Sequence, residues 1–502
     1  MITTLALRHL VVRKLRSMFL LLGFSLGVGV MIVLLSVGEA MLDQSRDISL
    51  VGGGALTVLP QGIDVEAMRT GGVSGMFFGI ERARFLARQV FGGPRHESLV
   101  EAVSPVIEGK LLYLRHGGRT VVVRSGGEIP SRARAVGTGL TVRSGTWSDS
   151  RADSAYVVPT AQQFYDELDH FHHPSTRDST WGEWHYFNVV TSPDEWWYIT
   201  YVVGGEVPSG KWGGQVLITH RAATGRYERF TASVPSSEVQ LDTARADLKL
   251  SRSQVRQRNG TYHLQAYANG TTGPLQIDMT VVPDPHRYFP PVETREESFL
   301  SGYVVPALRA EASGRICVSD ECRTFMAAPA YHDHNWGVWR AVTWEWGTAT
   351  GRHYNLLYGG VYGSTSRTPF FLALVDSLGV KQVLRFTDIR YEGGRPLAGA
   401  ASATAPGRFT LVATHEEDSV GLSVGVVDAL GTNMAAGDFR RVFLQMRGSF
   451  VLSGRVGGQT VADSGMGFFE TYLTDSSATA DANRHVGRPA YNPSLTFTPA
   501  ER

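Results

Sequence analysis

The sequence predicts a mainly β protein in which one transmembrane helix and a small α+β region precede a long β-rich part. Short apolar and aromatic runs alternate with Gly-containing turns over residues 181–473, a pattern typical of closely spaced strands. The chain holds 56 Gly and 10 Trp among its 502 residues, which favours turns and aromatic-rich strands. One uncharged apolar run near the N-terminus has the length of a membrane span.

Charge and cysteine content exclude several classes of protein. The chain carries 48 Lys and Arg against 47 Asp and Glu, a net charge of +1. This balance excludes a basic nucleic-acid binder, so we expect no nucleic-acid partner. A hydrophobic content of 43% excludes a disordered chain. Two cysteines exclude a disulfide-dense scaffold and any zinc site built from three or four cysteines.

The first predicted element is a transmembrane helix at residues 18–38. This segment is uncharged and almost wholly apolar, and about 20 residues cross a bilayer. Basic residues precede it in a stub at 1–17, and acidic residues follow it. The positive-inside rule therefore predicts a single pass, with a cytoplasmic N-terminus and an extracytoplasmic bulk. A cleaved signal peptide is the alternative, although its apolar core is usually shorter.

The next predicted element is a small α+β extracytoplasmic region at residues 39–170. Alternating Val and Leu around Gly-rich turns predict hairpins between residues 100 and 159. A polar, Pro-containing stretch then marks the boundary to the β-rich part. Asn259-Gly260 and Asn269-Gly270 are strong hairpin signals there. Roughly 290 residues of closely spaced strands favour barrels or sandwiches, and residues 476–502 read as a tail.

Cys317 and Cys322 flank a four-residue stretch in the β-rich part. Such a short loop suits a hairpin disulfide in an oxidising compartment, and its closure gains modest stability. Two free thiols are the alternative. The spacing differs from the CxxC pattern that is usual for a redox-active pair.

The first aromatic motif is GEWHYFN at residues 182–188, followed by two Trp and a Tyr at residues 196–198. Strand alternation places Trp184 and Tyr186 on one face of the predicted strand, and His185 on the other. A core strand with a buried Trp is one interpretation. The other is that Trp184 and Tyr186 form part of a ligand-binding wall.

The second motif, YHDHNWG at residues 331–337, crowds titratable and aromatic groups together, and Trp344, Glu345 and Trp346 follow it. Alternation places His332 and His334 on one face and Asp333 on the other. Three interpretations remain open. The two His could bind a metal, but no compelling third ligand is visible, so we predict no metal. The other two are a structural hydrogen-bonded cluster and an active site with an acid between aromatic walls.

The N-terminal part resembles the start of a MacB-type ABC-transporter permease. The resemblance rests on the basic stub and apolar run at residues 5–41 and on the strand-rich segment at residues 100–159. It implies a bacterial inner-membrane location and partnership with the ATPase and permease subunits of an ABC transport system. The chain has no further membrane helices and no GxxxxGK[ST] phosphate loop, so it is neither a complete permease nor the ATPase.

The two aromatic motifs together resemble the carotenoid 1,2-hydratase family, also called CrtC/AttH-like. That family's fold implies two consecutive lipocalin-like β-barrels, here at residues 175–328 and 329–475. His334 and Trp336 match the family's His-x-Trp pair. Tyr358 is the nearest match to its Tyr-x-Asp pair, but no acid follows at the required position. Asp333 or Glu345 would then have to supply the acid, with Trp344 and Trp346 as further ligand-binding walls.

These observations lead to three functional hypotheses. The first is a membrane-anchored protein that binds or handles a hydrophobic, lipid-like molecule for an ABC transport system, because lipocalin-type barrels enclose apolar ligands. The second is a hydratase or isomerase that acts on a C=C bond of an isoprenoid or polyene. Its acid would protonate carbon, and aromatic faces would stabilise the carbocation. The third is a permease fragment whose barrels only dock a partner. None requires a cofactor.

Overall fold

The structure is a computed structural model of the 502-residue chain. It describes the following residues: 14–51, 83, 86–91, 93–136, 148–151, 153, 159–172, 181–206, 209–295, 299–339, 343–362, 370–397, 400–436, 439–474 and 484–485. The chain divides into two compact units, Met1–Val157 and Val158–Arg502. Each unit is described by itself. Most of the predicted tail at residues 476–502 lies outside the described residues.

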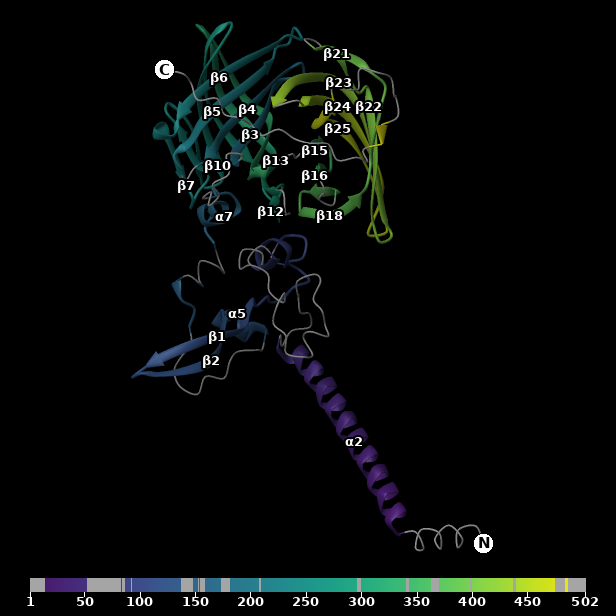
Figure 1. The fold of residues 1–502 in the computed structure, drawn as a ribbon. Helices are drawn as coiled ribbons and strands as arrows, with labels where there is room; N and C mark the ends of the chain where they lie inside the picture. The colour runs from purple at the N-terminus through teal and green to yellow at the C-terminus, as the bar shows by residue number, and fades with distance from the viewer. Residues whose placement is uncertain are drawn as a thin grey trace. The chain divides into compact units, whose positions relative to one another are not determined.

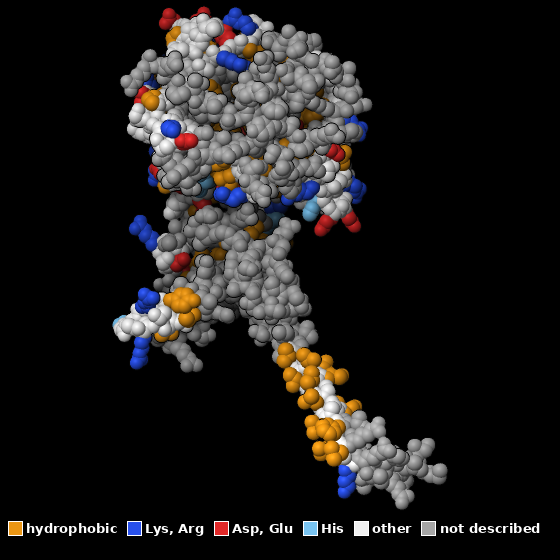
Figure 2. Space-filling view, in the orientation of Figure 1, with side chains coloured by type: hydrophobic (Ala, Val, Ile, Leu, Met, Phe, Trp, Pro, Cys, Tyr) orange, Lys and Arg blue, Asp and Glu red, His pale blue; other side chains and the backbone are white. Residues whose placement is uncertain are grey.

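The first unit contains a long helix and a hairpin. Its elements are α2 (Lys14–Val51), η1 (Leu86–Phe91), β1 (Val106–His116), β2 (Arg119–Glu128) and α5 (Pro130–Val136). The hairpin confirms the strands predicted around Gly117 and Gly118, which turn the chain with positive φ. Exposed apolar side chains line α2 (Figure 2), including Phe24 and Leu34. Within the described residues, no helix is long and apolar enough to cross a membrane, so the predicted transmembrane span at 18–38 is not supported.

The second unit begins with a closed β-barrel (Figure 1). Among the described residues, eight strands close it in the order β11-β13-β14-β3-β4-β5-β6-β10, because β10 also pairs with β11. They are β3 (Trp181–Ser192), β4 (Glu195–Glu206), β5 (Lys211–Arg221), β6 (Tyr227–Pro235), β10 (Thr261–Gly270), β11 (Gly273–Pro283), β13 (Phe299–Val318) and β14 (Glu321–Trp339). Shorter elements flank them: α7 (Ala161–Leu168), η3 (Ser236–Glu238), β7 (Val239–Asp242), β8 (Asp247–Leu250), β9 (Ser253–Arg258) and β12 (Phe289–Arg295).

A second barrel follows directly in the chain. In the described part of the sequence, eight strands form it in the order β18-β17-β16-β15-β25-β24-β23-β22, and a β18–β22 pairing closes the ring. They are β15 (Thr343–Gly351), β16 (Asn355–Tyr362), β17 (Phe370–Asp376), β18 (Gly379–Phe386), β22 (Arg408–His415), β23 (Asp418–Ala436), β24 (Phe439–Val456) and β25 (Gln459–Thr474). Short strands flank the ring: β19 (Ile389–Glu392), β20 (Arg395–Leu397), β21 (Ala400–Ala405) and β26 (Arg484–His485). The predicted mainly β fold with two barrels is confirmed.

The burial of alternate residues explains how these strands form barrels. In β10, Tyr262, Leu264 and Ala266 are buried in the core of the first barrel, whereas the residues between them are less buried. Strand β17 differs, because nearly every residue in it is buried. Leu372 faces the core of the second barrel, and Phe371 joins a cluster that contains residues of both barrels. The two barrels therefore pack against each other through a shared apolar joint.

Four local predictions can be compared with the strands. Cys317 and Cys322 form the predicted hairpin disulfide, as a directly opposed pair between β13 and β14. Asn259 and Gly260 make the predicted turn between β9 and β10. The second Asn-Gly signal also marks a hairpin, between β10 and β11, although Gly270 still pairs with Gly273 and the turn itself lies at residues 271–272. The predicted barrel boundary at 328/329 falls inside β14, since this strand completes the first ring before β15 starts the second.

Candidate active site between the two barrels

The candidate site depends on which way the side chains of β14 point. In the antiparallel ladder with β3, Asp333 lies opposite Tyr186 and His334 lies opposite His185. Directly opposed residues share a face of the sheet, and neighbours along a strand alternate. Asp333 and Tyr186 therefore face the second barrel, whereas the two His point into the first. The predicted division of the motif into two faces is confirmed.

A cavity of about 570 Å³ lies where the two barrels meet. All four aromatic residues predicted to bind ligand line it: Trp184, Tyr186, Trp344 and Trp346. Asp333 is the predicted acid that reaches it, and Glu470 from β25 is a second carboxyl group in its wall. The cavity size is within the ~300–1,000 Å³ range of small-molecule sites, and apolar walls with few polar groups are typical of such sites.

Asp333 is held in the cavity wall by two hydrogen bonds. The hydroxyl of Tyr331 donates to its Oδ2 at 2.7 Å, and the Nδ2 of Asn335 donates to its Oδ1 at 2.6 Å. Burial raises the pKa of Asp333 to about 8, although the Tyr331 hydrogen bond opposes this shift and the charge of Glu470 adds to it. The carboxyl group of Asp333 is therefore protonated at neutral pH, as a general acid requires.

Glu470 lies in the same wall and was not singled out as a site residue in the sequence. The indole Nε1 of Trp344 donates to its Oε2 at 3.2 Å. The Nε2 of Gln445 lies 3.5 Å from Oε1 of Glu470 and donates to the hydroxyl of Tyr186 at 3.1 Å. Burial raises the pKa of Glu470, and the Trp344 hydrogen bond opposes this shift. Only the pairing of β15 with β25, which places Glu470 opposite Trp346, identifies Glu470 as a site residue.

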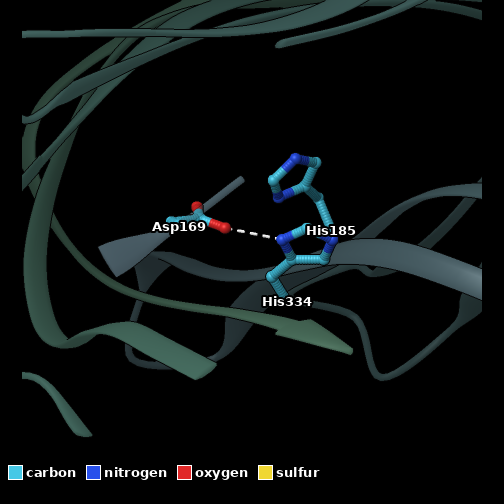
Figure 3. A group of neighbouring side chains, drawn as sticks. All are labelled: Asp169, His185 and His334. Carbon is cyan, nitrogen blue, oxygen red and sulfur yellow. Dashed lines mark hydrogen bonds and ion pairs between the residues drawn. The ribbon is translucent and has the colours of Figure 1, made fainter. Parts of the chain in front are cut away.

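His334 occupies a different place, inside the first barrel. Its Nδ1 lies 2.5 Å from Oδ1 of Asp169 (Figure 3), and its Nε2 lies 3.0 Å from Oε1 of Glu183. Burial alone would lower the pKa of His334, but the carboxylates of Asp169 and Glu183 outweigh it and raise this pKa to about 9. His334 is therefore a buried imidazolium that donates to two carboxylates. Asp169 comes from the loop after α7 and was not predicted as a site residue.

Asp169, His185 and His334 are the group of described residues that could hold a metal ion. One ligand atom from each lies within 4.8 Å of the other two, and all three side chains are buried. Both ring nitrogens of His334 already contact carboxylates, Asp169 at 2.5 Å and Glu183 at 3.0 Å, so a metal at this group would have to displace one of these contacts. Both ring nitrogens of His185 lack a hydrogen-bond partner, and burial followed by the charge of His334 holds its pKa well below the usual range.

The remaining predicted catalytic residues lie apart from the cavity. The indole of Trp336 stacks on the ring of His172 at 3.7 Å between centroids, at the first barrel. Glu345 points into the second barrel, where it accepts hydrogen bonds from Tyr391 at 2.6 Å and Thr471 at 2.8 Å. Burial raises the pKa of Glu345 to about 7 despite these bonds. Tyr358 is fully buried among the apolar core of the same barrel. The five candidates thus fall into three places.

Comparisons with known proteins give the following results. No family model matches the chain, and no characterised protein matches it. The similar solved structures include one assigned as AttH from Nitrosomonas europaea, with 15% identity, a TM-score of 0.43, and coverage of 61% of this chain and 97% of that chain. CghA with Sch210972 has 11% identity, a TM-score of 0.44, and coverage of 59% and 89%. Kievitone hydratase from Nectria haematococca has 14% identity, a TM-score of 0.39, and coverage of 62% and 95%. The predicted MacB-type resemblance finds no support in these comparisons.

Proposed function

We propose that this chain is a hydratase or isomerase that acts on a C=C bond of a hydrophobic isoprenoid or polyene held between the two barrels. The observation that carries this proposal is the buried carboxyl group of Asp333 in the wall of an aromatic-lined cavity, where burial raises its pKa to about 8. A carboxylic acid that stays neutral at pH 7 can donate a proton where an ordinary Asp is ionised. Asp333 thereby supplies the acid that is missing after Tyr358.

The proposed hydration balances with water as the co-reactant. The Oδ–H bond of Asp333 breaks as the π electrons of the alkene form a new C–H bond, which leaves a carbocation and an Asp333 carboxylate. Water adds to the cationic carbon and forms a C–O bond. The proton released by that water returns to Asp333 and regenerates the acid. In the isomerase case, Asp333 takes a proton from the neighbouring carbon instead, and the double bond moves.

The aromatic walls support this chemistry. Indole and phenol rings attract a cation over their faces by about 0.5–2 kcal/mol each, with the larger values where water is excluded. Trp184, Trp346 and Tyr186 line the cavity and would surround a carbocation formed beside Asp333. Trp346 also donates from its Nε1 to the hydroxyl of Tyr331 at 3.1 Å, and Tyr331 bonds Asp333. This chain of hydrogen bonds fixes the acid against the wall.

The test uses the full chain with an acyclic carotenoid such as lycopene in H₂¹⁸O and D₂O. Wild-type protein should place deuterium on carbon, and ¹⁸O in the product identifies hydration rather than isomerisation. Asp333→Asn keeps the shape but cannot donate the proton, so we expect kcat to fall by about 10²–10⁴-fold. The control is Asp278→Asn, an exposed residue of β11. Undiminished turnover in Asp333→Asn would refute the proposed role.

A second candidate function is binding of a hydrophobic, lipid-like molecule without turnover. The same apolar cavity favours it, since apolar walls alone suffice for binding. Native mass spectrometry would show a lipid bound to wild-type protein that forms no product with any polyene. Association with the ATPase and permease subunits of an ABC transport system finds no support among the described residues. The bacterial inner-membrane location stays a prediction.

A further inference from the structure

The arginines at the joint between the barrels differ in whether they have partners. Arg221 pairs with Asp428 at 2.8 Å, and Arg229 donates to Oγ1 of Thr432 at 2.6 Å. The guanidinium of Arg447 lies over the ring of Trp196 in the first barrel, 5.6 Å from its centroid. Each of these three arginines contacts a residue of the other barrel. Arg385 also lines the cavity, but it has no hydrogen-bond or ion-pair partner among the residues that the structure describes.

The strand geometry aims Arg385 at the cavity. Its neighbours Leu384 and Phe386 belong to the core of the second barrel, so alternation turns Arg385 outward. It lies directly opposite Phe371 in the β17–β18 ladder, and opposed residues share a face. Phe371 lines the same cavity. Arg385 is also close enough to Tyr303 to lower that residue's pKa against the raising effect of burial.

The wall beside Arg385 is aromatic. The rings of Tyr303 and Phe371, which both line the cavity, are stacked at 2° and 5.9 Å between centroids. Phe289 stacks on Phe371 at 15° and 5.4 Å from outside the cavity lining. Aromatic walls suit an unsaturated apolar body. The cavity therefore combines an apolar aromatic wall with the exposed guanidinium of Arg385, which has no hydrogen-bond or ion-pair partner among the described residues.

The carboxyl groups of the cavity do not neutralise this guanidinium. Burial raises the pKa values of both Asp333 and Glu470, which favours their neutral forms. Neither forms an ion pair with Arg385 in the described structure. An arginine fork binds a carboxylate through two parallel hydrogen bonds, the strongest pairing available to it. The charge balance of the cavity thus favours an anionic group on the ligand.

We infer that the ligand of the inter-barrel cavity is an amphipathic acid, an unsaturated apolar chain whose terminal carboxylate pairs with Arg385. The apolar body would lie along Tyr303 and Phe371 and bring its C=C bonds into the chamber that Asp333 lines. This inference rests on the proposed function only in taking that cavity as the substrate site. Arg385 acts as a specificity residue, because it selects the acid over the matching alcohol without taking part in proton transfer.

The experiment compares two polyenes that differ in one end group, all-trans-retinoic acid and all-trans-retinol. Quenching of tryptophan fluorescence reports binding, since three Trp line the cavity. Wild-type protein should bind the acid about tenfold or more tightly than the alcohol, as expected for a charge-assisted pair. Arg385→Gln should lose that preference and keep its affinity for retinol. Lys381→Gln is the matched control, on the same strand and with the same loss of charge, because Lys381 does not line the cavity.

Each outcome decides the question. An acid preference that survives in Arg385→Gln, or equal affinities of wild-type protein for acid and alcohol, would overturn the inference. Retained retinol binding shows that the variant is folded. Binding and turnover are measured separately, so the two proposals can fail independently. If Asp333→Asn keeps its activity while Arg385→Gln loses acid selectivity, the proposed proton donor is wrong and the ligand class stands.

Discussion

Asp333 and His334 are neighbours in the chain, yet they reach opposite sides of β14 and experience opposite surroundings. Asp333 is buried, and its hydrogen-bond partners among the described residues, Tyr331 and Asn335, are neutral, so its pKa rises to about 8. His334 lies between two carboxylates, whose attraction outweighs burial and raises its pKa to about 9. Both side chains are protonated at neutral pH, which leaves Asp333 uncharged and His334 positively charged. A neutral acid suits an apolar cavity, whereas a paired imidazolium suits a closed barrel core.

The pH dependence of turnover follows from the protonation of Asp333. The protonated form is active, so kcat/KM should be constant below about pH 8 and fall tenfold per pH unit above it. The groups that face this carboxyl are Tyr331 and Asn335 from its own strand, Tyr186 from β3 and Glu470 from β25; His334 acts on it through space from the other face.

The measurement is a pH–rate profile from pH 5 to 10 with the full chain. Glu345→Gln is the control, because the pKa of Glu345 is also raised, to about 7, but its side chain points into the second barrel. This variant should keep the alkaline limb near pH 8, whereas Asp333→Glu should move it. Activity that rises above pH 8 would contradict the assignment of Asp333 as the acid.

At the scale of elements, the hairpin of β13 and β14 is closed by the Cys317–Cys322 disulfide. The loop it closes is short, so the chain-entropy model gives about 2 kcal/mol of stability. Cys317→Ser/Cys322→Ser should lower the free energy of unfolding by about that amount and leave kcat unchanged, because Cys322 lies near the start of β14, eleven residues (333 − 322) before Asp333. Thermal unfolding with and without a thiol reductant checks this. A reductant that destabilises the double variant as much as the wild type would contradict it.

Strand alternation made much of the site predictable at this scale. Because side chains alternate along a strand, the sequence predicted that Asp333 and His334 point in opposite directions. The four-residue loop between the cysteines indicated their disulfide. Glu470 could not be found in the same way, because it meets Trp346 only through the pairing of β15 with β25. That pairing joins segments more than a hundred residues apart, and local patterns do not specify such partners. Arg385 was missed for the same reason.

At the scale of the molecule, the cavity exists because two barrels pack together. The density of short strands predicted barrels or sandwiches, and the resemblance implied two barrels in sequence. Neither could show that β17 is buried on both faces or that Tyr186 and Phe371 share one apolar cluster. Packing between the barrels is set by side chains from both, and it decides which acid enters the cavity. In the sequence, Glu345 and Asp333 were equal candidates for the catalytic acid. In the structure, Asp333 lines the cavity, whereas Glu345 points into the second barrel.

Asp428 anchors that joint and gives a test of it. It accepts from Arg221 at 2.8 Å and from the hydroxyl of Tyr227 at 3.0 Å, so it ties the second barrel to the first. Asp428→Ala removes the acceptor that Arg221 and Tyr227 share and should cost roughly 1–3 kcal/mol in unfolding free energy. It should also weaken retinol binding, because the cavity walls come from both barrels. Asp247→Ala is the matched control, since its partner Arg258 lies in the same barrel at 2.7 Å. Calorimetry should show destabilisation in both variants, and fluorescence titration should show weaker binding only in Asp428→Ala. Equal retinol affinity in the two variants would mean that the joint does not set the cavity.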